Sequence, residues 1–116
     1  LVTGVQTCAL PIYSNEYGFR AGICTPFHFY DMESDAETNL TIHPFAVMDS
    51  ALKKYLNLSP DEALDVLKTV IDEIKAVEGT LYTIWHNNSL CELFGWEGWS
   101  RVYEQMLDYA HQVKNK

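Results

Sequence analysis

Basic residues are scarce in this sequence. Eight Lys and Arg stand against sixteen Asp and Glu, which gives a formal net charge of -8. A surface of this sign repels a phosphate backbone, so nucleic acid is not an expected partner. The acidic residues are scattered along the predicted helices and loops. This distribution favours a well-solvated surface and does not identify a substrate.

Cysteines are few, and long apolar runs are missing. The three cysteines are too irregularly spaced for a disulfide framework; they are Cys8, Cys24 and Cys91. Their odd number favours free thiols, and no CxxC pair indicates a zinc site. No apolar run approaches the ~20 residues that cross a bilayer, so no membrane span is expected. Hydrophobic residues still make up 47% of the 116 residues, which suits the core of one domain or of part of one.

The first twelve residues, LVTGVQTCALPI, carry no charge and do not begin with Met. They resemble the translation of sequencing-adapter DNA and show neither strand alternation nor helical spacing. We expect residues 1–12 to be a non-native leader and residues 13–116 to be the C-terminal part of a domain. A native strand and a signal-peptide remnant are the alternatives, although no basic segment opens the sequence. The sequence indicates no compartment.

Three apolar segments predict strands. Residues 17–30 alternate short apolar runs with glycines and a proline, which is typical of a buried strand that breaks into a loop. Residues 31–39 are polar and acidic without periodicity, and predict an exposed loop. Residues 40–49 are rich in apolar and β-branched side chains, with Pro44 favouring an edge position or a bulge. Residues 80–85, TLYTIW, predict a third strand.

The segment 59–77 carries the strongest helix signals. Ser59 can cap the helix, Pro60 suits its first position, and Glu62 completes a capping box. Gly79 is expected to end it. Apolar residues recur every three or four positions and predict one buried stripe, formed by Ala63, Leu64, Leu67, Val70, Ile71, Ile74 and Val77.

These elements form a βαβ unit, which predicts parallel strands at 40–49 and 80–85 around the helix. A short helix over 50–58 and a final helix over about 99–113 complete the chain. A parallel sheet needs cover on both faces or closure into a barrel, and so few elements do not provide it. We therefore expect an α/β fold that is part of a (β/α) barrel, the C-terminal βα units only, with the N-terminal part of the domain missing.

Three polar residues follow apolar runs, and functional side chains gather at the C-terminal ends of parallel strands. His86 can give and take a proton near neutral pH, or it is a structural histidine that binds a loop carbonyl. Asp49 can orient His86 or bind a substrate hydroxyl, or it caps the short helix that follows. Arg20 can clamp a carboxylate or form a structural ion pair.

Two further residues are candidates for binding a sugar. Trp96 lies in the loop after His86 and offers a flat apolar face, although aromatic residues at such spacing are also typical of a core. Asn87 adds a polar amide next to His86. His28 and His43 lie on different elements without a short spacing or a third ligand, so we interpret both as structural or exposed and expect no metal site in this chain.

The segments GFRAGICTPFHFYD, IHPFAVMD and TLYTIWHN occur in this order, with a capped helix between the last two. Together they resemble the closing third of bacterial polysaccharide deacetylase-like (NodB-homology) proteins, most of all a Bacteroidetes-type subgroup. The resemblance covers about residues 17–109, and its most specific parts are WHN and RAG.

The resemblance implies a distorted (β/α) barrel in which a divalent metal, zinc or similar, activates water to hydrolyse an acetyl group on a carbohydrate. The family's metal-binding and catalytic-base motifs precede these segments and are absent from this sequence. His86 matches the late His that serves as general acid. Arg20 matches more loosely the Arg that orients the base, because Pro26 follows it by six residues instead of two. Asp49 matches the partner of the catalytic His by position only, since the usual Asp-Trp pair is absent.

We therefore expect a fragment of a metal-dependent carbohydrate deacetylase, inactive as given, whose partner is a carbohydrate. The alternative is a non-catalytic carbohydrate-binding or scaffold domain on the same fold, in which Arg20, His86 and Trp96 bind a sugar without chemistry.

Overall fold

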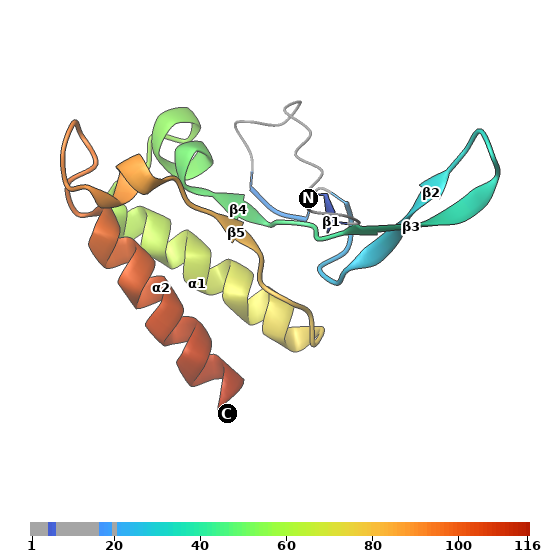
Figure 1. Ribbon diagram of the computed structural model, residues 1–116. Helices are drawn as coiled ribbons and strands as arrows, with labels where there is room; N and C mark the ends of the chain where they lie inside the picture. Colours follow the sequence, from blue (N-terminus) through green and yellow to red (C-terminus); the bar gives the residue numbers. More distant parts are fainter. Residues whose placement is uncertain (1–4, 7–16, 20) are drawn as a thin grey trace.

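The computed structural model of the chain describes residues 5–6, 17–19 and 21–116 (Figure 1). Two helices and a pair of short parallel strands form its body, and a β-hairpin projects from one side. The elements in order are β1 (Val5–Gln6), β2 (Phe27–Asp31), β3 (Ala36–Ile42), β4 (Val47–Met48), the π-helical turn η2 (Ala51–Tyr55), α1 (Pro60–Ala76), β5 (Thr83–Ile84), the 3-10 turn η3 (Asn87–Leu90) and α2 (Trp99–Lys114).

The predicted βαβ unit is present. Strands β4 and β5 pair in parallel, with Val47 opposite Thr83 and Met48 opposite Ile84, and α1 lies between them in sequence. Because both strands run the same way, their C-terminal ends meet at one edge. This edge positions the candidate site.

Helix α1 begins as the sequence predicts. The Ser59 hydroxyl accepts the Glu62 amide, the Glu62 carboxylate accepts the Ser59 amide at 2.8 Å, and Pro60 takes the first helical position. The end of α1 differs from the prediction that Gly79 terminates it, because the residue in the left-handed conformation is Glu78, with φ 54°. Gly79 donates its amide to the Ile74 carbonyl at 2.9 Å. A Cβ at Gly79 would collide with the Cys24 thiol, so glycine permits a close approach of two segments here.

The core lies between the two helices and the β4–β5 pair. Figure 1 shows α1 and α2 side by side, and buried side chains from both helices pack with the strand residue Val47. Val77 departs from the buried stripe predicted for residues 59–77, since 65% of it is exposed. The cluster consists of Ala46, Val47, Leu52, Ala63, Leu67, Val70, Ile71, Ile74, Trp96, Trp99, Val102 and Met106.

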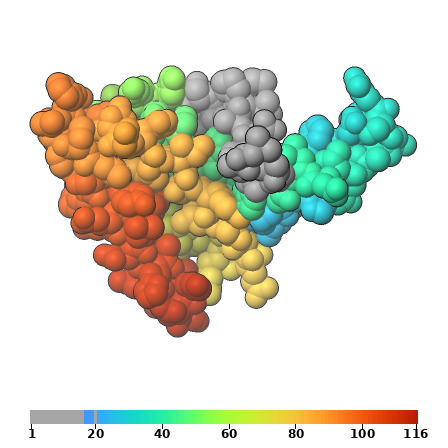
Figure 2. Space-filling view, viewed as in Figure 1, coloured from blue at the N-terminus to red at the C-terminus, as the bar shows by residue number. Residues whose placement is uncertain are grey.

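The prediction for residues 17–39 is wrong in part. Instead of one buried strand and an exposed loop, β2 and β3 form an antiparallel hairpin that projects from the body (Figures 1 and 2). Cross-strand contacts support it: His28 Nδ1 lies 2.6 Å from a Glu37 carboxylate oxygen, and the Thr38 hydroxyl donates to the Phe29 carbonyl at 2.7 Å. Both faces of β2 are largely solvated, so polar residues suit these strands and their polarity does not mark a loop.

The predicted strand over residues 40–49 is divided in two. Strand β3 ends at Ile42 and β4 begins at Val47, with Pro44 in the interruption. Proline has no amide to donate to a ladder, which accounts for the break. The Ala46 amide resumes the connection by donating to the Tyr82 carbonyl at 3.0 Å.

The described strands form two separate sheets, one in the order β1-β3-β2 and the other a β4-β5 pair. No barrel closes within this part of the chain, and the part-barrel architecture stays a prediction. Neither α1 nor α2 combines the length and apolar character that a membrane span requires, and no other helix among residues 5–6, 17–19 and 21–116 does so.

Candidate functional site

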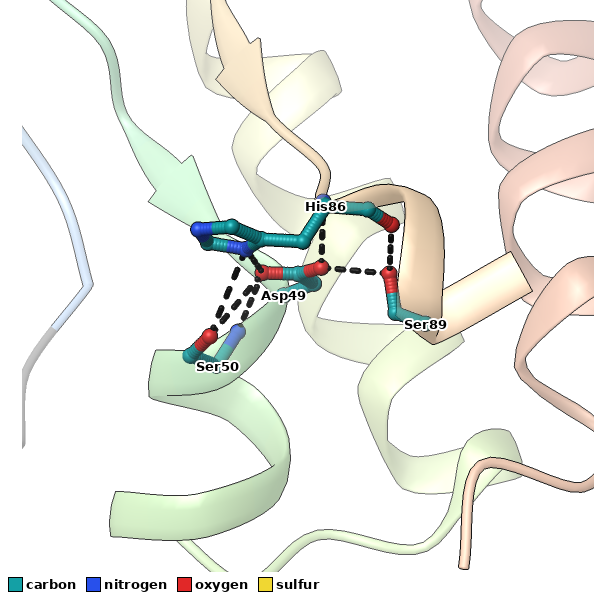
Figure 3. A network of polar contacts seen from close by, with 4 residues as sticks. All are labelled: Asp49, Ser50, His86 and Ser89. Atoms are coloured by element: carbon teal, nitrogen blue, oxygen red, sulfur yellow. Dashed lines mark hydrogen bonds and ion pairs between the residues drawn. The ribbon is translucent and has the colours of Figure 1, made fainter. Parts of the chain in front are cut away.

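Asp49 and His86 lie side by side where β4 and β5 end (Figure 3). Asp49 follows Met48 directly, and His86 comes two residues after the last residue of β5. Nδ1 of His86 and Oδ1 of Asp49 are 2.7 Å apart. The parallel strand ends thus bring together two residues that lie 37 positions apart in sequence.

The Asp49 carboxylate is fully buried, and each of its oxygens receives one backbone donor and one close side-chain donor. Oδ1 accepts the Ser50 amide at 2.6 Å and the His86 Nδ1–H at 2.7 Å. Oδ2 accepts the His86 amide at 2.8 Å and the Ser89 hydroxyl at 2.5 Å. The Ser50 hydroxyl adds a longer contact to Oδ1, at 3.2 Å. These four close donors match the four lone-pair positions of an ionised carboxylate.

The environment of Asp49 favours its charged form. Burial alone would raise the pKa of Asp49, but hydrogen bonds from the His86 backbone, the Ser89 and His86 side chains and the Ser50 backbone together outweigh it. The pKa of Asp49 therefore lies below its ordinary value of 3.8. An ionised Asp49 is an acceptor only, so His86 must donate from Nδ1.

The His86 ring has one nitrogen held and one turned away. The side chain is 48% exposed, whereas that of Asp49 is 0% exposed. Figure 3 shows the second ring nitrogen, Nε2, on the side of the ring away from Asp49. Because Nδ1 is bonded to the carboxylate, Nε2 is the ring nitrogen that is left to exchange a proton with a ligand. This arrangement suits a general acid or base.

Two serines contact the pair, but the described groups do not form a serine-hydrolase triad. In such a triad the nucleophilic hydroxyl bonds the ring nitrogen that the carboxylate leaves free. Here the Ser50 hydroxyl lies 3.5 Å from Nδ1, and the Ser89 hydroxyl lies on the far oxygen of Asp49. Both hydroxyls therefore support the carboxylate and the ring orientation.

The structure corrects two interpretations of the sequence. Asp49 does not occupy the cap position of η2, which belongs to Ser50 and has no side-chain cap bond; its carboxylate accepts the Ser50 amide but also binds His86 and Ser89. Trp96 is only 5% exposed and packs edge-on against Trp99 at 5.4 Å between ring centroids. It is a core residue, because its faces are covered by the chain and not open to a sugar ring.

The remaining candidates stay predictions. Asn87 is exposed at the start of η3, next to His86, where an amide can reach a ligand. Arg20 lies outside the described residues. Ser50 and Ser89 were not predicted as site residues. The signal for Ser89 is its position three residues after His86, because a tight turn of that length directs a side chain back to its start.

Among the described residues, no group of three or more His, Cys, Asp or Glu side chains could hold a metal ion. His28 pairs with Glu37 on the exposed hairpin, and His43 Nδ1 lies 2.7 Å from the Tyr82 hydroxyl, which agrees with their interpretation as structural or exposed. The part of the chain in view does not fit a metal centre, and we derive no metal-dependent step from it. Cys24 and Cys91 are free thiols, as expected, and Cys8 lies outside the described residues.

No protein-family model matches this chain, and neither a curated protein nor a solved structure shows significant similarity to it. The family resemblance therefore stays a prediction from three sequence segments.

Proposed function

We propose that this chain is the C-terminal part of a metal-dependent carbohydrate deacetylase and supplies the proton donor of its active site. The observation that carries the proposal is the Asp49–His86 pair, in which a buried, ionised carboxylate holds Nδ1 of a half-exposed imidazole. The resemblance of the segments around Asp49 and His86 to polysaccharide deacetylases supports the same role.

The proposed step concerns the leaving group of the reaction. When an acetamide on a sugar is hydrolysed, the sugar nitrogen leaves poorly unless it gains a proton as its bond to the acetyl carbon breaks. The protonated His86 donates from Nε2, and the electron pair of the C–N bond goes to the nitrogen. Asp49 stays ionised and stabilises the imidazolium beforehand, as a buried carboxylate does beside a catalytic histidine.

The other parts of the site follow from the resemblance and lie partly outside the described residues. Arg20 is proposed to orient the catalytic base, and Asn87 to bind a sugar hydroxyl. The base and the divalent metal, zinc or similar, are assigned to a preceding part of the domain. Trp96 has no place in this proposal because it is buried.

A carbohydrate-binding or scaffold domain is the second candidate function. The observation that favours it is the exposure of His86 and Asn87 at one loop, because two polar side chains there can bind hydroxyl groups without any reaction. Fold alone does not decide between binding and catalysis.

Acetate release tests the proposal. The protein encoded by the complete gene is incubated with acetylated chitooligosaccharides and added zinc or cobalt. We expect acetate release that falls by about 10²–10⁴-fold in His86→Ala, the usual contribution of a general acid. His28→Ala is the control, because His28 also contacts a carboxylate but lies on the projecting hairpin. An unchanged rate in His86→Ala contradicts the assignment of His86, and sugar binding without acetate release supports the binding domain.

A further inference from the structure

The Ser89 hydroxyl lies between the two partners of the pair. Ser89 is on η3, is 0% exposed, and contacts Oδ2 of Asp49 at 2.5 Å and the His86 carbonyl at 2.6 Å (Figure 3). A hydroxyl has one proton, and both neighbours are acceptors. The proton can therefore serve only one of them fully.

The carboxylate is the acceptor that needs this proton. The His86 carbonyl already accepts the backbone N–H of Ser89 at 3.1 Å. Oδ2 of Asp49 is buried and charged, and its one other donor among the described residues is the His86 amide. A hydrogen bond to a charged acceptor is stronger than one to a carbonyl. Hence the hydroxyl proton is directed to Asp49.

We propose that Ser89 is a positioning residue, whose hydroxyl holds the Asp49 carboxylate so that Oδ1 faces Nδ1 and keeps the neutral His86 ring protonated on Nδ1. Without the hydroxyl, the His86 amide is the one donor that Oδ2 keeps among the described residues, and the carboxylate is held less firmly about its last torsion. Oδ1 then bonds Nδ1 less well, and the ring loses its preference for that tautomer. The effect of Ser89 on catalysis rests on the proposed deacetylase function, whereas its effect on the His86 tautomer does not depend on that function.

The tautomer of His86 can be observed directly. Nitrogen NMR of the isotope-labelled chain distinguishes a protonated from an unprotonated ring nitrogen, with His28, His43 and His111 as internal references. The variants are Ser89→Ala, which removes the donor, and Ser89→Thr, which keeps it. Ser100→Ala is a matched control, because the Ser100 hydroxyl also donates to a carboxylate, that of Glu92.

We expect the wild type to be protonated on Nδ1 of the neutral His86 ring. Ser89→Ala should lower the ratio of the Nδ1–H to the Nε2–H tautomer by about tenfold, the effect of losing one charge-assisted hydrogen bond. Ser89→Thr and Ser100→Ala should keep the wild-type ratio. A lower melting temperature in Ser89→Ala with an unchanged ratio would show a purely structural serine and overturn the proposal. If Ser89→Ala does not fold, Ser89→Cys, a weaker donor of similar size, takes its place with the same criterion.

Kinetics separate this inference from the proposed function. In the complete protein, we expect Ser89→Ala to lower kcat about tenfold at unchanged KM, because the serine acts on the proton donor and not on the substrate. A shifted tautomer in a protein that releases no acetate refutes the deacetylase function and upholds the positioning role. Acetate release with an unchanged tautomer in Ser89→Ala refutes the positioning role alone.

Discussion

Replacing Asp49 by Asn changes one oxygen of the buried carboxylate into an amide NH2 group. In the wild type, each carboxylate oxygen accepts one backbone amide: Oδ1 accepts that of Ser50, and Oδ2 accepts that of His86. Whichever way the new side chain turns, one of these two amides faces another donor. The substitution therefore leaves one of these partly buried backbone N–H groups without its acceptor at almost unchanged side-chain volume.

The cost in stability can be estimated from the one backbone N–H that loses its acceptor. An orphaned buried amide costs about 1–3 kcal/mol, and the remaining bonds lose their charge assistance. Two terms act the other way: removal of the buried charge returns part of its desolvation cost, and the Ser89 hydroxyl can rotate to accept from the new NH2. We expect Asp49→Asn to lower the free energy of unfolding by about 2 kcal/mol, a large part of the ~5–15 kcal/mol typical of a domain.

The stability lost in Asp49→Asn should become smaller at acid pH. Because the folded state lowers the pKa of Asp49, its contribution to stability is fully present above the unfolded value of 3.8 and disappears as the pH falls through the lower folded value. The part of the difference between wild type and Asp49→Asn that comes from the Asp49 charge should thus shrink as the pH falls below about 4.

Urea unfolding at several pH values measures both quantities, with Asp61→Asn as the matched control. Asp61 also binds a side-chain N–H donor, that of Arg101 at 2.7 Å, but the side chains of Asp61 and Arg101 are 82% and 51% exposed. A surface pair of this kind contributes less than about 1 kcal/mol. Equal losses in Asp49→Asn and Asp61→Asn, or a difference that persists in acid, would refute the view that the buried carboxylate anchors the site.

Three further outcomes are expected. Ser59→Ala should lower the stability by about 1 kcal/mol in thermal melts followed by circular dichroism, because it removes the cap of α1, whereas Ser34→Ala in the hairpin turn should not affect the helix. Gly79→Ala should lower the free energy of unfolding, measured in urea, by about 1–3 kcal/mol, because the new Cβ meets the Cys24 thiol. The same substitution should cost less in a Cys24→Ala background, and equal costs in both backgrounds would argue against this clash. Cys91, which is exposed, should react with a thiol reagent before the partly buried Cys24, and peptide mass spectrometry detects the order.

Helix α1 could be predicted from the sequence almost to the residue. Its start is set by local chemistry, because Ser59, Pro60 and Glu62 act on neighbouring amides without help from the rest of the fold. Its end depends on a distant contact: Gly79 is required by the approach of Cys24 and not by its own backbone angle. Such tertiary requirements leave no local pattern in the sequence.

That Asp49 and His86 lie near each other was also predictable, because parallel strands end at the same edge. The supporting bonds were not, since whether Asp49 caps a helix or holds His86 depends on how η2 and η3 are placed around it. Trp96 illustrates the same limit. Its loop position favoured an exposed face, but packing against Trp99 buries it.

The sequence pattern does not predict the β2–β3 hairpin, because its strands lack the apolar pattern of buried strands. A polar, acidic segment usually indicates a loop, but Glu37 and Thr38 are paired across to β2 in a ribbon that projects into solvent. Strand propensity alone does not reveal such pairing, since the partner strand provides the contacts.

The proposed role of His86 as proton donor can be tested most directly by comparing two leaving groups in the complete protein. A sugar acetamide needs a proton on its leaving nitrogen, whereas a nitrophenyl acetate leaves as a stable anion. We predict that His86→Gln slows acetamide hydrolysis by about 10²–10⁴-fold and nitrophenyl acetate hydrolysis by less than about threefold. Equal losses on both substrates, or no loss on the acetamide, would contradict the account.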